Sequence, residues 1–250
     1  LNHPLANEEA DKRHCRREAQ ALLESIEAFC KQINCDDGYL RFKTLVGNES
    51  VFPPHWVRDE FDIEEVDQYR HDQIESFVES ITPKNEESWF TFIERCASSQ
   101  SNDLATFRFF EKFLIDLSKK KPKTAERYIK MASKDLLSFL PAFLKGISES
   151  GDVKTHNRLV ELFLNDDNHL NALAKHWRNC KPAQPSVIKR ILDASIVKSD
   201  DIAVIECLLF AMEEAGSQKV PPRDEFFLLA LRYLTDKKDA RWVRGGWFLQ

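Results

Sequence analysis

The sequence predicts an all-α protein, and three observations support this fold class. Apolar residues recur at helical spacing along most of the chain, whereas no stretch of four or more residues alternates convincingly between apolar and polar. Ser, Asn and Asp residues, whose side chains cap helices, precede most of these periodic segments. Glycine is rare, at 7 of 250 residues, which disfavours an all-β fold with its many glycine turns. We expect about 10–12 helices.

Composition narrows the classes of function. The net charge is −5 and the pI is about 5.9, so the chain as a whole is not drawn to nucleic acid or to anionic membrane, although a local basic patch remains compatible. No run approaches the roughly 18 apolar residues that span a bilayer, and no signal peptide is recognisable, so we expect no membrane partner. The six cysteines form no C-x-x-C pair. We therefore expect buried free thiols in a reducing compartment, hence a cytoplasmic protein without metal or cofactor.

The first 61 residues are expected to form a helical extension and an irregular loop. Asn7-Glu8-Glu9 is expected to open a long helix that ends near Ile33. Its first half mixes basic and acidic residues without an apolar face, which favours a position in solvent or against an absent domain. Its second half has an apolar stripe at helical spacing. The stripe comprises Leu22, Leu23, Ile26, Phe29, Cys30 and Ile33.

The extension then becomes less regular. Asp36 and Asp37 lack the spacing of a calcium loop, so residues 34–38 are interpreted as a turn. A short helix is expected from Tyr39 to Val46. Residues 47–61 include two adjacent prolines, and we interpret them as an ordered loop anchored by Trp56.

The helix around which the rest of the chain is organised is expected between Ser101 and Pro122. Ser101-Asn102-Asp103 offers capping oxygens, Lys119-Lys120-Lys121 suits the negative end of the helix dipole, and Pro122 cannot continue the helix. Apolar residues cover so much of its girth that neighbours must pack on at least two sides. These residues are Leu104, Phe107, Phe109, Phe110, Phe113, Leu114, Ile115 and Leu117.

The same signals predict the remaining helices. Pro83 is expected to end the helix that starts near residue 62, and Gly216 is expected to end the helix that starts near residue 200. Pro141 lies inside an apolar run and should kink or split that helix. The other expected starts are near residues 85, 123, 134, 152, 167, 185, 222 and 237.

Consecutive helices pair into units of about 35–40 residues, a period that is typical of helical-hairpin repeats. The signatures of tetratricopeptide and ankyrin repeats are absent. We therefore expect a right-handed α-α superhelix of HEAT-like repeats over residues 62–250, preceded by the extension at residues 1–61. An irregular globular helix bundle is the alternative. The start at Leu1 and the end at Gln250 suggest a piece of a longer protein, cut short at the C-terminus.

One segment carries a resemblance to known proteins. Asn102-Asp103-Leu104-Ala105-Thr106-Phe107, followed by Phe110, Phe113-Leu114, Leu117 and Lys121-Pro122, resembles a segment in the helical linker or sensor regions of very large bacterial proteins. Those proteins carry nucleotidase or nucleotide-switch modules and are implicated in phage defence. The resemblance covers about twenty residues. It implies a helical recognition or scaffolding region whose catalytic modules lie elsewhere in the polypeptide, and it carries over no active residue.

Two groups of residues are candidates for binding a protein partner or a neighbouring domain. Trp56 and Arg58 lie in the irregular loop, where an aromatic anchor and a cation can contact a partner. Arg241, Trp242 and Arg244 form the most concentrated basic and aromatic segment. An amphipathic last helix, whose tryptophan packs on its neighbour, is the structural alternative.

The chain also allows a nucleic-acid-binding hypothesis. Lys12, Arg13, Arg16 and Arg17 form a basic cluster that can pair with phosphate, and the C-terminal segment mixes cations with an aromatic ring in the manner of single-strand binders. This hypothesis requires the two basic segments to share one face. A solvated helix with ion pairs four residues apart is the alternative for the first cluster.

No catalytic motif is found. The sequence has no phosphate-binding glycine loop and no nucleophile elbow. His169 and His176 are seven residues apart, whereas metal ligands on a helix favour a spacing of three or four. We assign no catalytic or metal-binding residue and expect no deep polar pocket. An enzyme without a recognisable motif, such as a helical-repeat DNA glycosylase with a similar period, stays open.

Overall fold

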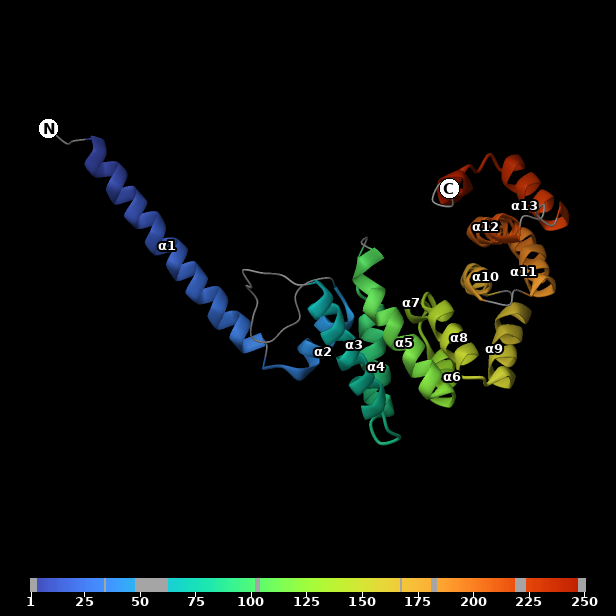
Figure 1. Ribbon diagram of the computed structural model, residues 1–250, viewed down its shortest axis with the longest axis horizontal. Coiled ribbons are helices and arrows are strands. Elements are labelled where there is room, and N and C mark those ends of the chain that lie inside the picture. Colours follow the sequence, from blue (N-terminus) through green and yellow to red (C-terminus); the bar gives the residue numbers. More distant parts are fainter. Residues whose placement is uncertain are drawn as a thin grey trace. The chain divides into compact units, whose positions relative to one another are not determined.

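The computed structural model describes residues 4–33, 35–47, 63–101, 104–166, 168–180, 184–218 and 224–246 (Figure 1). All regular structure in these ranges is helical, with fourteen α-helices, one short 3-10 helix and no strand. The predicted all-α class is therefore confirmed. None of the helices in these ranges is both long enough and apolar enough to cross a membrane.

The chain divides into two compact units. The first comprises Leu1–Ile74 and Asp103–Phe109, and the second comprises Glu75–Asn102 and Phe110–Gln250. The boundary predicted after residue 61 falls outside the described residues and stays a prediction.

The first unit contains α1 (Pro4–Ile33), α2 (Asp37–Leu45), the beginning of α3 (Ile63–Ser80) and the 3-10 helix η1 (Leu104–Phe107). Helix α1 starts earlier than predicted, so Asn7 lies inside the helix and does not cap it. A proline is tolerated in the first helical turn, where its missing N–H has no intrahelical acceptor. Helix α2 begins at Asp37, two residues before the predicted start at Tyr39, because the Asp36 carboxylate caps it by accepting a hydrogen bond from the Tyr39 N–H at 2.9 Å.

A buried arginine is central to the first unit. The Arg70 guanidinium donates to the Gly47 carbonyl at 2.7 Å and lies 4.6 Å from the centre of the Phe109 ring. Gly47 also donates its N–H to the Thr106 carbonyl at 2.8 Å, and its φ of 102° is one that residues with a side chain rarely adopt. This glycine therefore connects the end of α2 to both α3 and η1.

The second unit holds the rest of α3 and the following helices. These are α4 (Glu86–Ala97), α5 (Arg108–Lys120, from Phe110 onward), α6 (Pro122–Met131), α7 (Lys134–Leu137), α8 (Leu140–Glu149), α9 (Val153–Asn165), α10 (Leu170–Asn179), α11 (Pro185–Lys198), α12 (Asp201–Gln218), α13 (Asp224–Asp236) and α14 (Arg241–Gly246).

Helices of the second unit pack on neighbours two positions along the chain. Helix α6 contacts α8, α8 contacts α10, α10 contacts α12 and α12 contacts α14, while α9 contacts α11 and α11 contacts α13. Helices adjacent in sequence, such as α8 and α9 or α12 and α13, also pack on each other. Figure 1 shows α8 to α13 following one another. The helices thus form two sets. Consecutive members of the first set (α6, α8, α10, α12 and α14) pack on one another, as do those of the second set (α9, α11 and α13), and helices of one set pack on helices of the other.

Helix α5 is covered on several sides, as predicted for the organising helix. Phe110, Phe113, Leu114 and Leu117 are completely buried. Its α-helical part starts only at Arg108, because residues 104–107 form the 3-10 turn η1. The predicted caps Asn102 and Asp103 lie outside the described residues.

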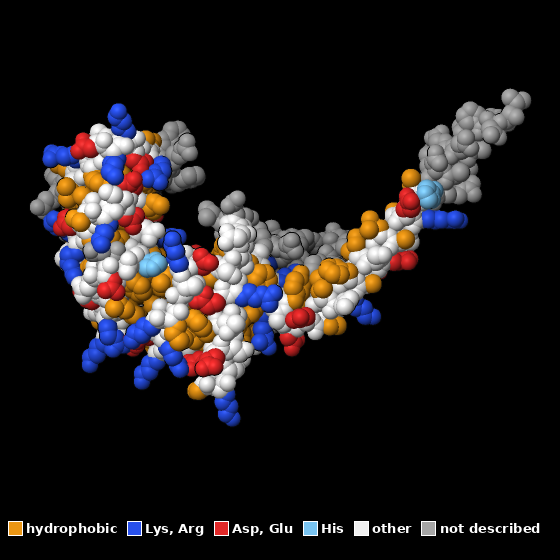
Figure 2. Space-filling model, turned by 180° about the vertical axis from the view of Figure 1, so that it is seen from behind, with side chains coloured by type: hydrophobic (Ala, Val, Ile, Leu, Met, Phe, Trp, Pro, Cys, Tyr) orange, Lys and Arg blue, Asp and Glu red, His pale blue; other side chains and the backbone are white. Residues whose placement is uncertain are grey.

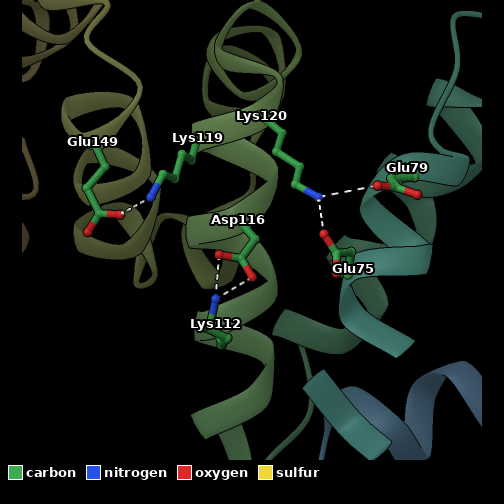
Figure 3. A network of polar contacts seen from close by, with 7 residues as sticks. All are labelled: Glu75, Glu79, Lys112, Asp116, Lys119, Lys120 and Glu149. Atoms are coloured by element: carbon green, nitrogen blue, oxygen red, sulfur yellow. Dashed lines mark hydrogen bonds and ion pairs between the residues drawn. The ribbon is translucent and has the colours of Figure 1, made fainter. Parts of the chain in front are cut away.

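The lysines at the end of α5 bind its neighbours (Figure 3). Lys119 pairs with Glu149 of α8 at 3.3 Å, whereas Lys120 points to the other side and pairs with Glu75 of α3 at 2.8 Å and with Glu79 at 3.5 Å. Lys121 donates to the Glu79 carbonyl at 3.3 Å and to the Ile81 carbonyl, which satisfies acceptors at the end of α3. These lysines therefore connect three helices, a role beyond the predicted complement to the dipole.

Two prolines and one glycine test the predicted helix ends. Pro141 splits its apolar run into α7 and α8, as predicted, and lies in the first turn of α8. Pro122 follows α5 but is itself the first residue of α6, so the predicted start at residue 123 or 124 is slightly late. Gly216 does not end α12, which continues to Gln218, because one glycine costs a helix only about 1 kcal/mol.

Candidate functional site

The second unit contains a hollow between three of its helices. The cavity has a volume of about 420 Å³ and is bounded by α5, α8, α10 and the turn between α7 and α8. Its volume falls in the usual range for ligand pockets, about 300–1,000 Å³. The expectation of no deep polar pocket stays a prediction, since apolar as well as polar residues line this hollow. The lining comprises Glu111, Ile115, Ser138, Phe139, Pro141, Ala142, Lys145, Ser148, Glu149, Lys175, His176, Asn179 and Cys180.

One glycine sets the spacing of the helices beside the hollow. Gly146 of α8 lies so close to α5 that a Cβ there would stand 2.2 Å from the Ile115 carbonyl oxygen and 2.6 Å from Ser118 Cβ. Only a residue without a side chain allows this approach. Because the backbones meet at Gly146, Ala142 and Lys145 of the same helix are positioned to line the hollow.

The hollow combines apolar and charged groups. Ile115, Phe139 and Ala142 supply apolar surface. Lys145 and Lys175 are exposed, and neither forms an ion pair with another described residue. Glu111 and Glu149 also line the hollow, and Glu149 is paired with Lys119 at 3.3 Å. A ligand with an apolar group and a negative charge placed beside the two lysines would complement this lining.

Two histidines form a buried pair at the inner wall. His176 of α10 is 3% exposed, and its Nε2 lies 2.9 Å from Nε2 of His156 on α9. The other nitrogen of His176 is hydrogen-bonded to the backbone of Pro141, which offers only a carbonyl acceptor. His176 therefore donates to Pro141, and its Nε2 faces Nε2 of His156. Trp177 packs edge-on against both imidazoles, at centroid distances of 5.7 and 5.4 Å.

Burial keeps both imidazoles neutral. It lowers the pKa of His176 to about 3, and the neighbouring His156 contributes further to this decrease. It also lowers the pKa of His156, partly opposed by the hydrogen bond with Asn157. Since both nitrogens of His176 are already bonded, the imidazole is not available as a base toward the hollow.

The remaining reactive group of the lining is a thiol. Burial raises the pKa of Cys180, against the opposing effect of its hydrogen bond with Ser148, so the neutral thiol dominates at pH 7. Among the described residues no three His, Cys, Asp or Glu side chains are grouped so as to hold a metal ion. The hollow thus offers shape, apolar surface and charge for binding, and no activated nucleophile.

The C-terminal candidates lie on and beside α14. Arg241 is engaged by Asp239, whose two carboxylate oxygens lie 3.0 Å from its Nε, and by Asp201 at 3.7 Å. The guanidinium holds the pKa of Asp239 at about 2. Trp242 is half-buried, and Arg244 belongs to α14 although its side chain is not described. Arg241 is therefore largely neutralised within its own unit.

The other candidates lie in the N-terminal part of the chain. Trp56 and Arg58 fall outside the described residues. Lys12 and Arg13 belong to α1 with undescribed side chains, whereas Arg16 and Arg17 are exposed on the same helix. The basic residues of α1 and α14 belong to different compact units, so the shared face that nucleic-acid binding requires stays a prediction.

The sequence interpretation missed His156, the partner of His176. His169 lies just before α10, at a φ of 54°, and is not the residue that contacts His176. A signal for His156 was present, because it shares a helical face with Leu159, Val160 and Phe163, all of which are buried.

Cysteine burial was predicted only in part. Cys96 and Cys207 are buried free thiols, but Cys15 and Cys35 are exposed. Cys15 lies within the first half of α1, and Cys35 lies just after the end of this helix.

Comparison with protein-family models, with curated proteins and with solved structures finds no match to this chain.

Proposed function

We propose that the chain is a non-catalytic helical interaction module that binds a protein partner or another domain of the same polypeptide. The observation that carries this proposal is the hollow between α5, α8 and α10, which has apolar surface, two lysines without an ion-pair partner among the described residues, a neutral His176 and a neutral Cys180 thiol. A short segment that places an apolar side chain in the hollow and an acidic residue beside it would complement both features.

The packing of the second unit supports a finer fold proposal. The contacts that link α8, α10 and α12, and those that link α9, α11 and α13, are what a stack of helical hairpins requires, because each repeat packs on the next through both of its helices. We therefore retain the HEAT-like α-α superhelix as the proposed architecture. Such stacks use extended surfaces for recognition and need no catalytic centre.

The bacterial setting is part of the proposal. It rests on the resemblance of residues 102–122 to helical regions of large phage-defence proteins, in which recognition and catalysis belong to different parts of the polypeptide. A module that binds a neighbouring domain fits that division of roles.

The binding test uses peptides selected for affinity to the full chain from a random display library. Selected peptides should share an apolar residue next to Asp or Glu, and their affinity is measured by fluorescence anisotropy. The double variant K145E/K175E should weaken binding at least tenfold, because it reverses two charges at the hollow. The control is K154E, which reverses an exposed lysine of α9 that does not line the hollow.

Two results would contradict the proposal. Equal affinity of K145E/K175E and of the unaltered chain would remove the hollow as the binding site. Salt-sensitive binding of single-stranded or duplex DNA, lost in R16E/R17E and retained in K145E/K175E, would favour the nucleic-acid alternative.

A further inference from the structure

Helix α1 has an apolar side without cover. Each of its side chains from His14 to Phe29 is exposed, and Leu22, Ile26 and Phe29 are 62%, 45% and 61% exposed. Figure 2 shows hydrophobic side chains of this helix open to solvent, with charged side chains beside them. Helices draw most of their stability from packing of the apolar face, and a contiguous exposed apolar patch marks an interaction surface.

The spacing of this face is that of a coiled coil. Its apolar positions recur in steps of four, three, four, three and four residues, which is the heptad pattern with two seam positions in every seven. The seam comprises Cys15, Ala19, Leu22, Ile26, Phe29 and Ile33. Of the positions that point away from the seam, Arg17, Gln20, Glu24, Glu27 and Lys31 are polar, and Ala21 and Ala28 are small.

We propose that α1 pairs with α1 of a second copy of this chain as a parallel, in-register, two-stranded coiled coil. Ile26 and Ile33 occupy the first seam position of the heptad and Leu22 occupies the second, and in a parallel coiled coil β-branched residues at the first position with leucine at the second favour two strands. A two-fold pair uses the same surface on both copies, and a continuous heptad seam meets this condition by itself.

The exposed apolar area of α1 approaches that of a specific dimer. Leu22, Ile26 and Phe29 of the seam, together with Leu23 beside it, each leave roughly 100 Å² uncovered, which amounts to about 800 Å² in two copies. The side-chain stems of Arg16 and Glu18, which flank the seam, extend the contact toward the roughly 1,000 Å² expected of a specific interface. This inference is independent of partner binding by the second unit.

The first test compares two double variants of the full chain by sedimentation equilibrium. L22E/F29E places carboxylates in the seam, whereas A21E/A28E adds the same charges one position earlier, on the side away from the seam. The unaltered chain and A21E/A28E should be dimers and L22E/F29E a monomer with the same helical circular dichroism. A monomeric unaltered chain, as expected if α1 is covered by its own chain or by a different protein, overturns the proposal. Equal dimerisation of both variants also overturns it.

The second test determines the direction of the pair through the exposed Cys15 thiol. A short bis-maleimide cross-linker is applied to the C30S/C35S variant, which keeps Cys15 as the exposed thiol among the described residues. Parallel pairing brings the two Cys15 side chains opposite each other, so a covalent dimer should form and should disappear in C15S/C30S/C35S. An antiparallel pair brings Cys15 opposite Ile33. A dimer by sedimentation that yields no Cys15 cross-link therefore overturns the parallel arrangement.

Discussion

Helices α1 and α5 have similar sequences in one respect and opposite surroundings in the structure. Both carry an apolar stripe between charged residues. The stripe of α5 is completely buried at Phe110, Phe113 and Leu117, whereas that of α1 is exposed at Leu22 and Phe29. The difference shows that an amphipathic pattern predicts a helix and its apolar face, but not what covers that face.

Charged residues differ between the two helices in the same way. Lys119 and Lys120 of α5 bind carboxylates on two other helices, at 3.3 and 2.8 Å. The ion pair that involves His14 of α1 stays within the helix, with Glu18. The covered helix α5 therefore connects its neighbours through charges, in addition to the pair of Lys112 with Asp116 along its own surface.

The largest expected difference is between two phenylalanines. Phe113→Ala in α5 should reduce the free energy of unfolding of the second unit by about 3–5 kcal/mol, because it leaves a cavity beside Trp89, whose ring stacks on Phe113. Phe29→Ala should change the free energy of unfolding of the second unit by less than about 0.5 kcal/mol, because Phe29 is exposed on α1 of the first unit. Urea unfolding followed by tryptophan fluorescence measures both values, and similar losses in the two variants would contradict the comparison.

The buried histidine pair should make stability depend on pH. The pKa of His156 and that of His176 lie below the ordinary value of 6.5, so the unfolded chain binds more protons as the pH falls below about 6.5. Stability is therefore retained above pH 6.5 and lost toward pH 3. Between pH 6.5 and 5 the loss from His176 alone should be about 2 kcal/mol.

Two variants isolate this effect. His176→Gln should reduce the loss of unfolding free energy between pH 6.5 and 5. The control is His14→Gln, which changes an exposed histidine of α1 and should leave that loss as it is in the unaltered chain. Imidazole NMR resonances provide a check without mutation, because the His176 ring should remain neutral at pH 5. A titration of His176 near pH 6.5 would refute the buried neutral pair.

A smaller effect is expected from a methyl group between α5 and α8. Gly146→Ala should destabilise the second unit by about 1–2 kcal/mol, since overpacking against the Ile115 backbone outweighs the higher helix propensity of alanine. Lys145→Ala, at the neighbouring exposed position of α8, is the control and should be nearly neutral. Thermal unfolding measures both, and a stabilised Gly146→Ala variant would show that the helices do not approach closely.

The smallest effect is expected from the exposed lysines. Lys120→Gln removes the pairs with Glu75 and Glu79 and should lower the melting temperature only slightly. The difference from the unaltered chain should vanish at about 1 M NaCl, where exposed charges are screened. A difference that persists at that salt concentration would indicate packing of the lysine stem, not charge.

The helix pattern was largely predictable because its signals are local. Asp152 caps α9 by accepting from the Thr155 N–H at 3.1 Å, and Pro141 separates α7 from α8. The signals failed where local chemistry allows two outcomes, as at Pro122, which both follows one helix and begins the next. The cap expected at Asn7 failed for a similar reason, since α1 already begins at Pro4.

The candidate site was not predictable by the same means. Its lining comes from residues between Glu111 and Cys180 that contact one another only through tertiary packing. The burial of His156 was readable from its helical face, but its pairing with His176 depends on how α9 meets α10. Sequence spacing does not determine that contact, because it describes one helix at a time.

The contact at Gly146 has a consequence for how α8 is aligned with α5. If α8 slid by one helical turn in either direction, Ala142 or Ser150 would replace the glycine, and its Cβ would collide with the Ile115 carbonyl. The two helices therefore have a single permitted alignment along their axes. The distance between α5 and α8 beside the cavity therefore depends on the absence of a side chain at Gly146.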